Sequence, residues 1–166
     1  DGDVLPLVVC GEDVAPSVVF TAPADRCVDA GVQTGLSGGL PTGGVYSGPG
    51  VTDDGNGLTY SFDPAAAGVG VQTLSYAQGG SMATDAVEVL ALPMVTFTAP
   101  ADLCIDEGVQ TNLGGGLPVG GVYSGPGVTD DGNGLTYTFN PAFAGLGVQT
   151  ITYADGDCGV TATDQV

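Results

Sequence analysis

The sequence predicts an all-β protein built from two similar sandwich domains, and three observations support this prediction. Residues 20–77 match residues 97–154 at 46 of 58 positions with a constant offset of 77, which identifies a tandem repeat. Glycine and proline make up about a quarter of the chain and separate short runs of valine, threonine, tyrosine and phenylalanine. No segment sustains the apolar spacing of a helix, so helices are expected to be single turns.

The strands of the first repeat are predicted from alternation and from the turn residues between them. Leu58, Tyr60 and Phe62 alternate with polar residues, which gives one buried and one solvated face. The residues from Pro64 to Gly68 form a compact corner, expected as one helical turn. Strands are predicted near 18–21, 32–36, 44–47, 58–62, 72–76 and 83–90, and the second repeat has the same set from Val95 onward.

Six or seven short strands in about 75 residues, with frequent turn signals, favour an immunoglobulin-like sandwich over a barrel. The expected architecture is two tandem immunoglobulin-like β-sandwich domains with an N-terminal extension strand. Residues 1–16 form the lead-in strand and linker, residues 17–93 the first repeat and residues 94–166 the second.

The lead-in resembles the end of the first repeat. Asp3 to Val8 is similar to Glu88 to Val95, and the second repeat stops at Val166, where the first continues through Glu88. The lead-in of one chain could therefore complete the last sheet of the next, which would join identical subunits head to tail by strand addition.

The charge of the chain is extreme. It has nineteen carboxylates, a single cationic side chain at Arg26 and no lysine or histidine, for a net charge of −18. A nucleic-acid partner is excluded, because phosphate binding depends on lysine and arginine. Such a surface attracts cations, above all calcium, although acidity that only keeps a β protein soluble explains the same composition.

No apolar run approaches the length of a membrane span, so we expect no membrane insertion. The chain begins at Asp1 without an initiator methionine, which suggests a processed product or part of a longer protein.

Four cysteines indicate the compartment. They form no CxxC pair and there is no histidine, so disulfides in an extracellular protein are favoured over zinc or redox motifs. Cys104 follows the first strand of its repeat and Cys158 opens the last, so a bridge between them is predicted. The first repeat has Ser81 at the position 77 residues before Cys158, which leaves Cys27 to pair with Cys10; a bridge from Cys10 to another subunit is the alternative.

The densest polar cluster is Asp53-Asp54-Gly55-Asn56-Gly57, repeated at residues 130–134. Asn-Gly and Asp-Gly supply the positive φ of tight hairpins, so a plain turn is one interpretation. A calcium site is the other, because hard cations bind converging carboxylate and carbonyl oxygens, although the EF-hand spacing is absent. Its candidate ligands are Asp53, Asp54 and Asn56 in the first repeat and Asp130, Asp131 and Asn133 in the second.

Enzymatic function is not expected. The chain offers no histidine as a base and no lysine for a Schiff base, and no serine or cysteine has an obvious activating neighbour.

The pattern GGVYSGPGVTDDGNGLTYSFDPAAAGVGVQTLSY, with the APADRC opening and the GDCGVTATD ending, resembles a known repeat type. It is similar to the tandem immunoglobulin-like repeats of large secreted surface adhesins of Bacteroidota, gliding-type proteins exported by the type IX route. The resemblance covers residues 17–166. It implies an extracellular, multi-repeat, adhesive or structural protein at the cell surface. Ser81 departs from the pattern, in which a cysteine closes the internal bridge.

The sequence therefore predicts a non-enzymatic structural protein whose partners are neighbouring repeats or identical subunits, with surface glycans as a further candidate. A carbohydrate-binding or accessory module of a secreted enzyme is the alternative function. An exposed row of aromatic side chains on one face would favour that alternative.

Overall fold

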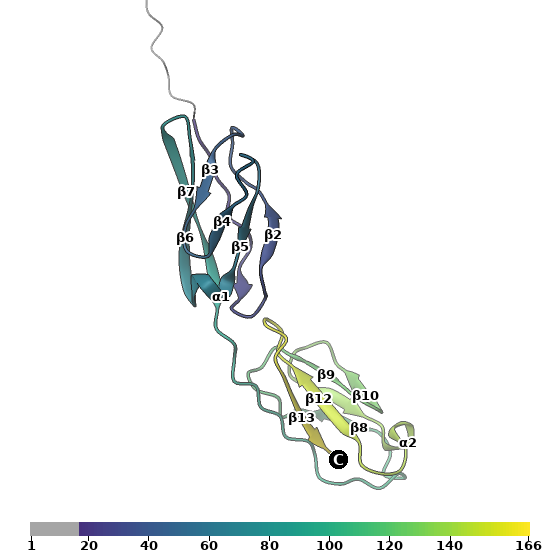
Figure 1. Cartoon of the computed structure of the whole chain (residues 1–166). Helices are drawn as coiled ribbons and strands as arrows, with labels where there is room; N and C mark the ends of the chain where they lie inside the picture. The colour runs from purple at the N-terminus through teal and green to yellow at the C-terminus, as the bar shows by residue number, and fades with distance from the viewer. Residues whose placement is uncertain (1–16) are drawn as a thin grey trace, which may run out of the picture. The chain divides into compact units, whose positions relative to one another are not determined.

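The computed structural model describes residues 17–166 and divides them into two compact units (Figure 1). The described part of unit 1 comprises residues 17–26 and 30–89, and unit 2 comprises residues 27–29 and 90–166. The predicted lead-in strand, residues 1–16, lies outside the described residues.

Unit 1 consists of two sheets and one short helix. The first sheet has the order β1 (Arg26–Cys27), β7 (Ser81–Leu90), β6 (Gly70–Gln78), β3 (Val45–Ser47). The second has the order β2 (Gln33–Leu36), β5 (Tyr60–Phe62), β4 (Val51–Asp53). The predicted corner is the single-turn helix α1 (Pro64–Ala67), whose N-terminal N–H groups bond the side chain of Asp63.

Unit 2 repeats this arrangement with shorter strands. One sheet has the order β13 (Thr161–Gln165), β12 (Thr150–Ala154), β9 (Val122–Ser124), and the other β10 (Val128–Asp130), β11 (Tyr137–Phe139), β8 (Gln110–Leu113). The helix α2 spans Pro141–Ala144. The predicted all-β sandwich class is confirmed. The short strands β1, β4 and β10 were not expected, and the predicted strand at 18–21 is a single bridge between Val19 and Leu40.

Equivalent residues of the two repeats differ by 77 in residue number before the last hairpin and by 79 after it. Ala22 N–H donates to Asp85 Oδ2 in unit 1, and Ala99 N–H donates to Asp164 Oδ2 in unit 2, both at 2.9 Å. In unit 1 the hairpin turns through Gly79 and Gly80, which both have positive φ. In unit 2, residues 155–160 join β12 to β13.

Because this turn is longer in unit 2, the alignment of Cys158 with Ser81, which assumed a constant offset of 77, is wrong. Ser81 opens β7 and pairs with Gln78, so its structural equivalent is Val160 rather than Cys158. Cys158 belongs to the two extra residues of the second repeat's hairpin. The turn is held by Asp155, whose Oδ2 accepts the N–H groups of Asp157 and Cys158.

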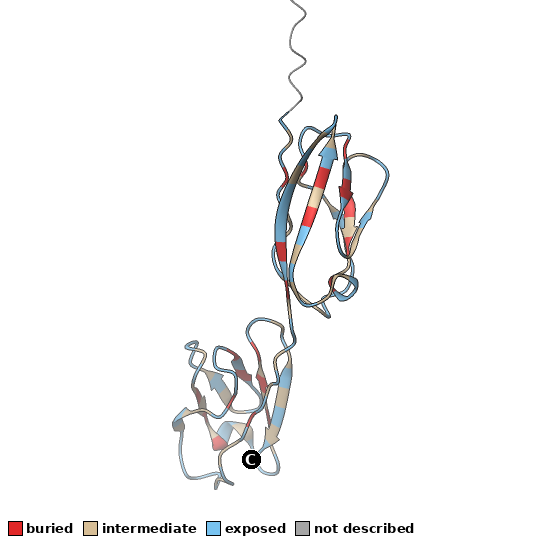
Figure 2. Cartoon of the chain, turned by 90° about the vertical axis from the view of Figure 1, so that its left-hand side faces the viewer, coloured by how far each residue is buried: buried red, intermediate tan, exposed pale blue. Residues whose placement is uncertain are grey.

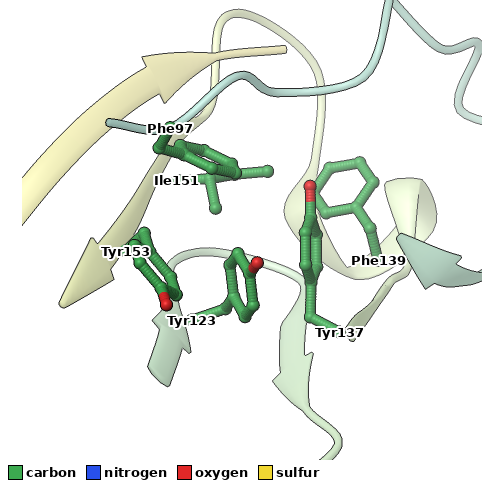
Figure 3. Packing of buried hydrophobic residues seen from close by; sticks show 6 residues of the cluster. All are labelled: Phe97, Tyr123, Tyr137, Phe139, Ile151 and Tyr153. Carbon is green, nitrogen blue, oxygen red and sulfur yellow. The ribbon is translucent and has the colours of Figure 1, made fainter. Parts of the chain in front are cut away.

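The space between the two sheets of each unit is filled mainly by tyrosine rings. Buried residues alternate with exposed ones along the strands (Figure 2). In unit 2 the rings of Tyr123, Tyr137 and Tyr153 lie beside one another, with centroids 4.5 and 4.7 Å apart for the two pairs that Tyr123 makes (Figure 3). Phe97, Phe139 and Ile151 complete this core, and unit 1 has the same aromatic residues at the equivalent positions, with Leu74 in place of Ile151.

Tyrosine hydroxyls fasten the loops to the core. Tyr76 Oη accepts a hydrogen bond from Gly44 N–H at 2.8 Å and donates to the carbonyl of Pro41 at 2.6 Å. Gly39 and Gly44 lie directly against the Tyr76 ring, and a Cβ on either would collide with it. Larger residues are therefore incompatible with this approach of backbone to ring.

Not every tyrosine hydroxyl is bonded. The hydroxyls of Tyr60 and Tyr137 are buried and have no hydrogen-bond partner among the described residues. Burial raises the pKa of each of these two phenols to about 12, and a neighbouring tyrosine adds to the shift. These two rings therefore contribute packing rather than loop attachment.

We expect removal of the hydroxyl to have different effects on the stability of unit 1 at the two kinds of tyrosine. Tyr76→Phe leaves Gly44 N–H and the Pro41 carbonyl without a partner, so we expect unit 1 to lose about 1–3 kcal/mol of stability. Tyr60→Phe removes a hydroxyl that has no partner and is expected to be neutral or stabilising. Urea denaturation followed by circular dichroism measures both. Equal losses in the two variants would contradict the attachment role of Tyr76.

Candidate functional site

The six predicted calcium ligands lie in the equivalent acidic loops of the two units. Asp53 ends β4, and Asp54 and Asn56 follow in the turn before β5. Asp130, Asp131 and Asn133 occupy the same places between β10 and β11. The two copies have nearly identical hydrogen bonds, so one description serves for both.

Within the loop, the side-chain oxygens accept hydrogen bonds from the turn itself. Asp53 Oδ2 accepts Tyr46 N–H and Asp53 Oδ1 accepts Gly55 N–H, both at 2.8 Å. Asn56 Oδ1 accepts the N–H groups of Leu58 and Thr59. Asp54 Oδ2 accepts the Thr59 hydroxyl at 2.6 Å. These contacts explain the residue types of the loop as turn geometry.

The cysteines pair differently from the prediction. A disulfide joins Cys27 to Cys158, with the Cα atoms 5.7 Å apart and a sequence separation of 131. The predicted Cys104–Cys158 bridge is therefore wrong, and so is Cys10–Cys27, because each sulfur forms one disulfide. Cys104 is exposed and has no disulfide partner among residues 17–166. Cys10 lies outside the described residues.

The geometry of the sandwich explains the error. Cys158 lies in the hairpin turn at one end of β13, whereas Leu103 and Ile105, which flank Cys104, border Val166 beyond its other end. A strand of this length separates its ends by roughly 15–20 Å. A disulfide needs Cα atoms within about 7 Å. Both cysteines belong to the second repeat, but they lie at opposite ends of unit 2.

The disulfide lies within unit 2, to which the segment 27–29 belongs. Val28 N–H donates to the carbonyl of Leu90 at 2.9 Å, next to the bridge. The Cys158 sulfur lies 4.0 Å from the carbonyl oxygen of Ala91. The strand end at Leu90, the bridge and the segment 27–29 are thus held together.

Unit 2 contains a groove of about 290 Å³ with a mainly apolar lining. On one side lie Asp102, Leu103 and Ile105, and on the other Leu146 to Gln149. Phe139 and Val166 also border it. Phe143, Leu146 and Val148 are strongly exposed in this region of the unit.

Unit 1 has a strand at the place of this groove. The end of β7 lies between β1 and β6, where Glu88 pairs with Val71 and Val89 pairs with Gly70. The Val89 side chain is 1% exposed. In unit 2 the ladder ends where Gln149 and Val166 exchange two hydrogen bonds. The equivalents of Gly70 and Val71, which are Gly147 and Val148, have no ladder partner among the described residues. The groove of unit 2 therefore lies at the place that the end of β7 occupies in unit 1.

Comparison with protein-family models found no matching family, and comparison with curated proteins found no match. Within residues 17–166, no helix is long and apolar enough to cross a membrane.

Calcium binding at the acidic loops stays a prediction, and a melting experiment tests it. A calcium site that exists in the folded chain raises the melting temperature in calcium chloride relative to EDTA. The double variant Asp54→Asn and Asp131→Asn keeps one acceptor oxygen at each site but loses the charge, so it should lose that rise. Identical melting curves of the original chain in calcium and in EDTA would leave these loops as turns alone.

Proposed function

We propose that the chain is a non-enzymatic, extracellular structural or adhesive repeat protein, a spacer of a cell-surface adhesin or a filament subunit. The observation that carries this proposal is the Cys27–Cys158 disulfide, whose sequence separation is 131 in a chain of 166 residues. The bond encloses most of both repeats in one covalent loop.

This loop has a mechanical consequence. When the two ends of the chain are pulled, tension passes from Cys27 directly to Cys158 and bypasses the residues between them. Only about 35 residues then extend, which gives roughly 120 Å at full stretch, against roughly 550 Å for the whole chain. This bond therefore sets an upper limit to the extension of the spacer under load.

The composition supports the same class of function. A stable disulfide is typical of oxidising, extracellular compartments. The net charge of −18 keeps the surface hydrated and repels the negatively charged backbone of nucleic acids. Lysine and histidine, the usual catalytic bases and covalent amines, do not occur in the sequence.

The aromatic residues do not favour the alternative of a carbohydrate-binding module. All six tyrosines and four of the five phenylalanines belong to the two cores, and tryptophan does not occur. Phe143 is the exposed aromatic side chain, at 85% exposure. An exposed row of rings on which sugars could stack is therefore missing from this chain.

Force spectroscopy on single molecules tethered at both ends tests the spacer function. In oxidising buffer we expect an extension limited to about 35 residues, without the length increments of domain unfolding. After reduction, or in the variant Cys158→Ser, unfolding should release roughly 400 Å of additional length. The variant Cys104→Ser serves as the matched control and should behave like the original chain. Full-length unfolding of the oxidised chain would contradict the proposal.

A further inference from the structure

We propose that Asn56 and Asn133 are sites of spontaneous deamidation, which the folded loops keep closed and which become reactive when a loop opens. The modification converts each asparagine to aspartate or isoaspartate through a cyclic imide with the next residue. This inference depends neither on calcium binding nor on the spacer function. It combines the Asn-Gly sequence of each loop with the hydrogen bonds that hold the asparagine.

The chemistry needs an asparagine followed by a residue whose backbone nitrogen is accessible. The nitrogen of Gly57 attacks the side-chain carbon Cγ of Asn56, and a C–N bond forms. The bond from Cγ to Nδ2 breaks, and Nδ2 leaves as ammonia together with the proton of the attacking nitrogen. Water then opens the imide at either carbonyl, which gives aspartate or isoaspartate. Glycine has no side chain that hinders this attack, so Asn-Gly is an especially reactive pair.

The fold requires this reactive pair. Gly57 has a φ of 67°, and a Cβ on it would lie 2.7 Å from the Cα of Gly43, so a larger residue is excluded. Asn56 is required as well, because its side chain both accepts and donates. Its oxygen accepts the N–H of Leu58 at 2.7 Å, and its nitrogen donates to the Thr59 hydroxyl at 2.8 Å. The loop therefore cannot avoid a dipeptide that is prone to deamidation.

The same hydrogen bonds oppose the reaction in the folded loop. Besides Leu58 N–H, Asn56 Oδ1 accepts Thr59 N–H at 2.8 Å. The Thr59 hydroxyl donates to Asp54 Oδ2 at 2.6 Å, so the lone pairs of its oxygen remain for Asn56 Nδ2. For Gly57 nitrogen to attack, the side-chain amide must turn and Nδ2 must leave, which breaks this connected set of bonds. The folded loop therefore reacts more slowly than the unfolded chain.

The second repeat has the same arrangement around Asn133. Its Oδ1 accepts the N–H groups of Leu135 and Thr136 at 2.8 Å, and its Nδ2 donates to the Thr136 hydroxyl at 2.8 Å. That hydroxyl donates to Asp131 Oδ2 at 2.6 Å. In an unfolded chain the two asparagines have identical neighbours and hence equal reactivity. A difference between their rates in the folded chain therefore reports on the loops alone.

The product cannot rebuild the loop. Aspartate lacks the amide that donates to Thr59, and it adds a negative charge close to Asp54. Isoaspartate adds a carbon to the main chain between β4 and β5, where Gly43 N–H donates to the carbonyl of Gly57 at 2.8 Å. Deamidation thus turns a reversible opening of the loop into a permanent one.

Peptide mass spectrometry of the full chain, incubated in EDTA, tests the proposal. In urea, with unfolding confirmed by circular dichroism, we expect Asn56 and Asn133 to deamidate at equal rates. In the same buffer without urea, both rates should fall by about tenfold or more, because several hydrogen bonds must break first. Equal rates with and without urea would overturn the proposal. The force measurement decides the spacer function separately.

Variants of one threonine test the hydrogen bond itself. Thr59→Val removes the hydroxyl that accepts Asn56 Nδ2 but keeps the branched shape. In the folded variant we expect Asn56 to deamidate roughly two- to tenfold faster, the effect of one hydrogen bond on a rate. Asn133 in the same molecule is the internal reference and should keep its rate. Thr59→Ser retains the hydroxyl and is the matched control, in which both rates should stay unchanged.

The reciprocal variant Thr136→Val should reverse the ratio of the two rates, with Asn133 now the faster site. It repeats the test in unit 2, so the result does not depend on the stability of unit 1 alone. Circular dichroism confirms that each variant is folded. A ratio of the two rates that stays at one in both folded valine variants would refute the protective role of the loop.

Discussion

The narrow space between two short sheets is the constraint on which the rest of this structure depends. Each unit fills that space with three tyrosine rings, and Tyr76 in unit 1 and Tyr153 in unit 2 reach through it to the loops at the edge. A ring can lie so close to the backbone only where glycine replaces a side chain, as at Gly39 and Gly44. This close approach explains glycine at Gly39, Gly44, Gly116 and Gly121, whereas many of the other glycines have positive φ.

The acidic loops depend on the same core. Asp53 accepts the N–H of Tyr46, a core residue, and the N–H of Gly55 in the turn. Its carboxylate therefore links the loop to the strand that carries a buried ring. Residues 43–60 and 120–137 are identical in sequence, and in both copies the aspartate of the loop makes the same two contacts.

Local patterns predicted the fold well, and the pairing of the cysteines poorly. Alternation at Leu58 to Phe62 and the Pro64 corner correspond to β5 and α1, since both signals are local. The alignment of Cys158 with Ser81 failed because the sequence identity ends at Ala154, just before the hairpin gains two residues. The predicted bridge is wrong because two residues of one repeat need not be close in space: β13 separates Cys158 from the segment around Cys104.

The end of β7 in unit 1, which lies between β6 and β1, accounts for several differences between the described parts of the two repeats. In unit 1, β6 begins at Gly70 because Glu88 and Val89 pair with it, and β1 exists because the same strand end lies beside it. In unit 2, β12 begins only at Thr150 and no strand is assigned at Leu103 and Cys104. Residues 97–113 and 146–149 are otherwise close copies of their counterparts, so the difference reflects which strand lies beside them in the structure and not their own sequence.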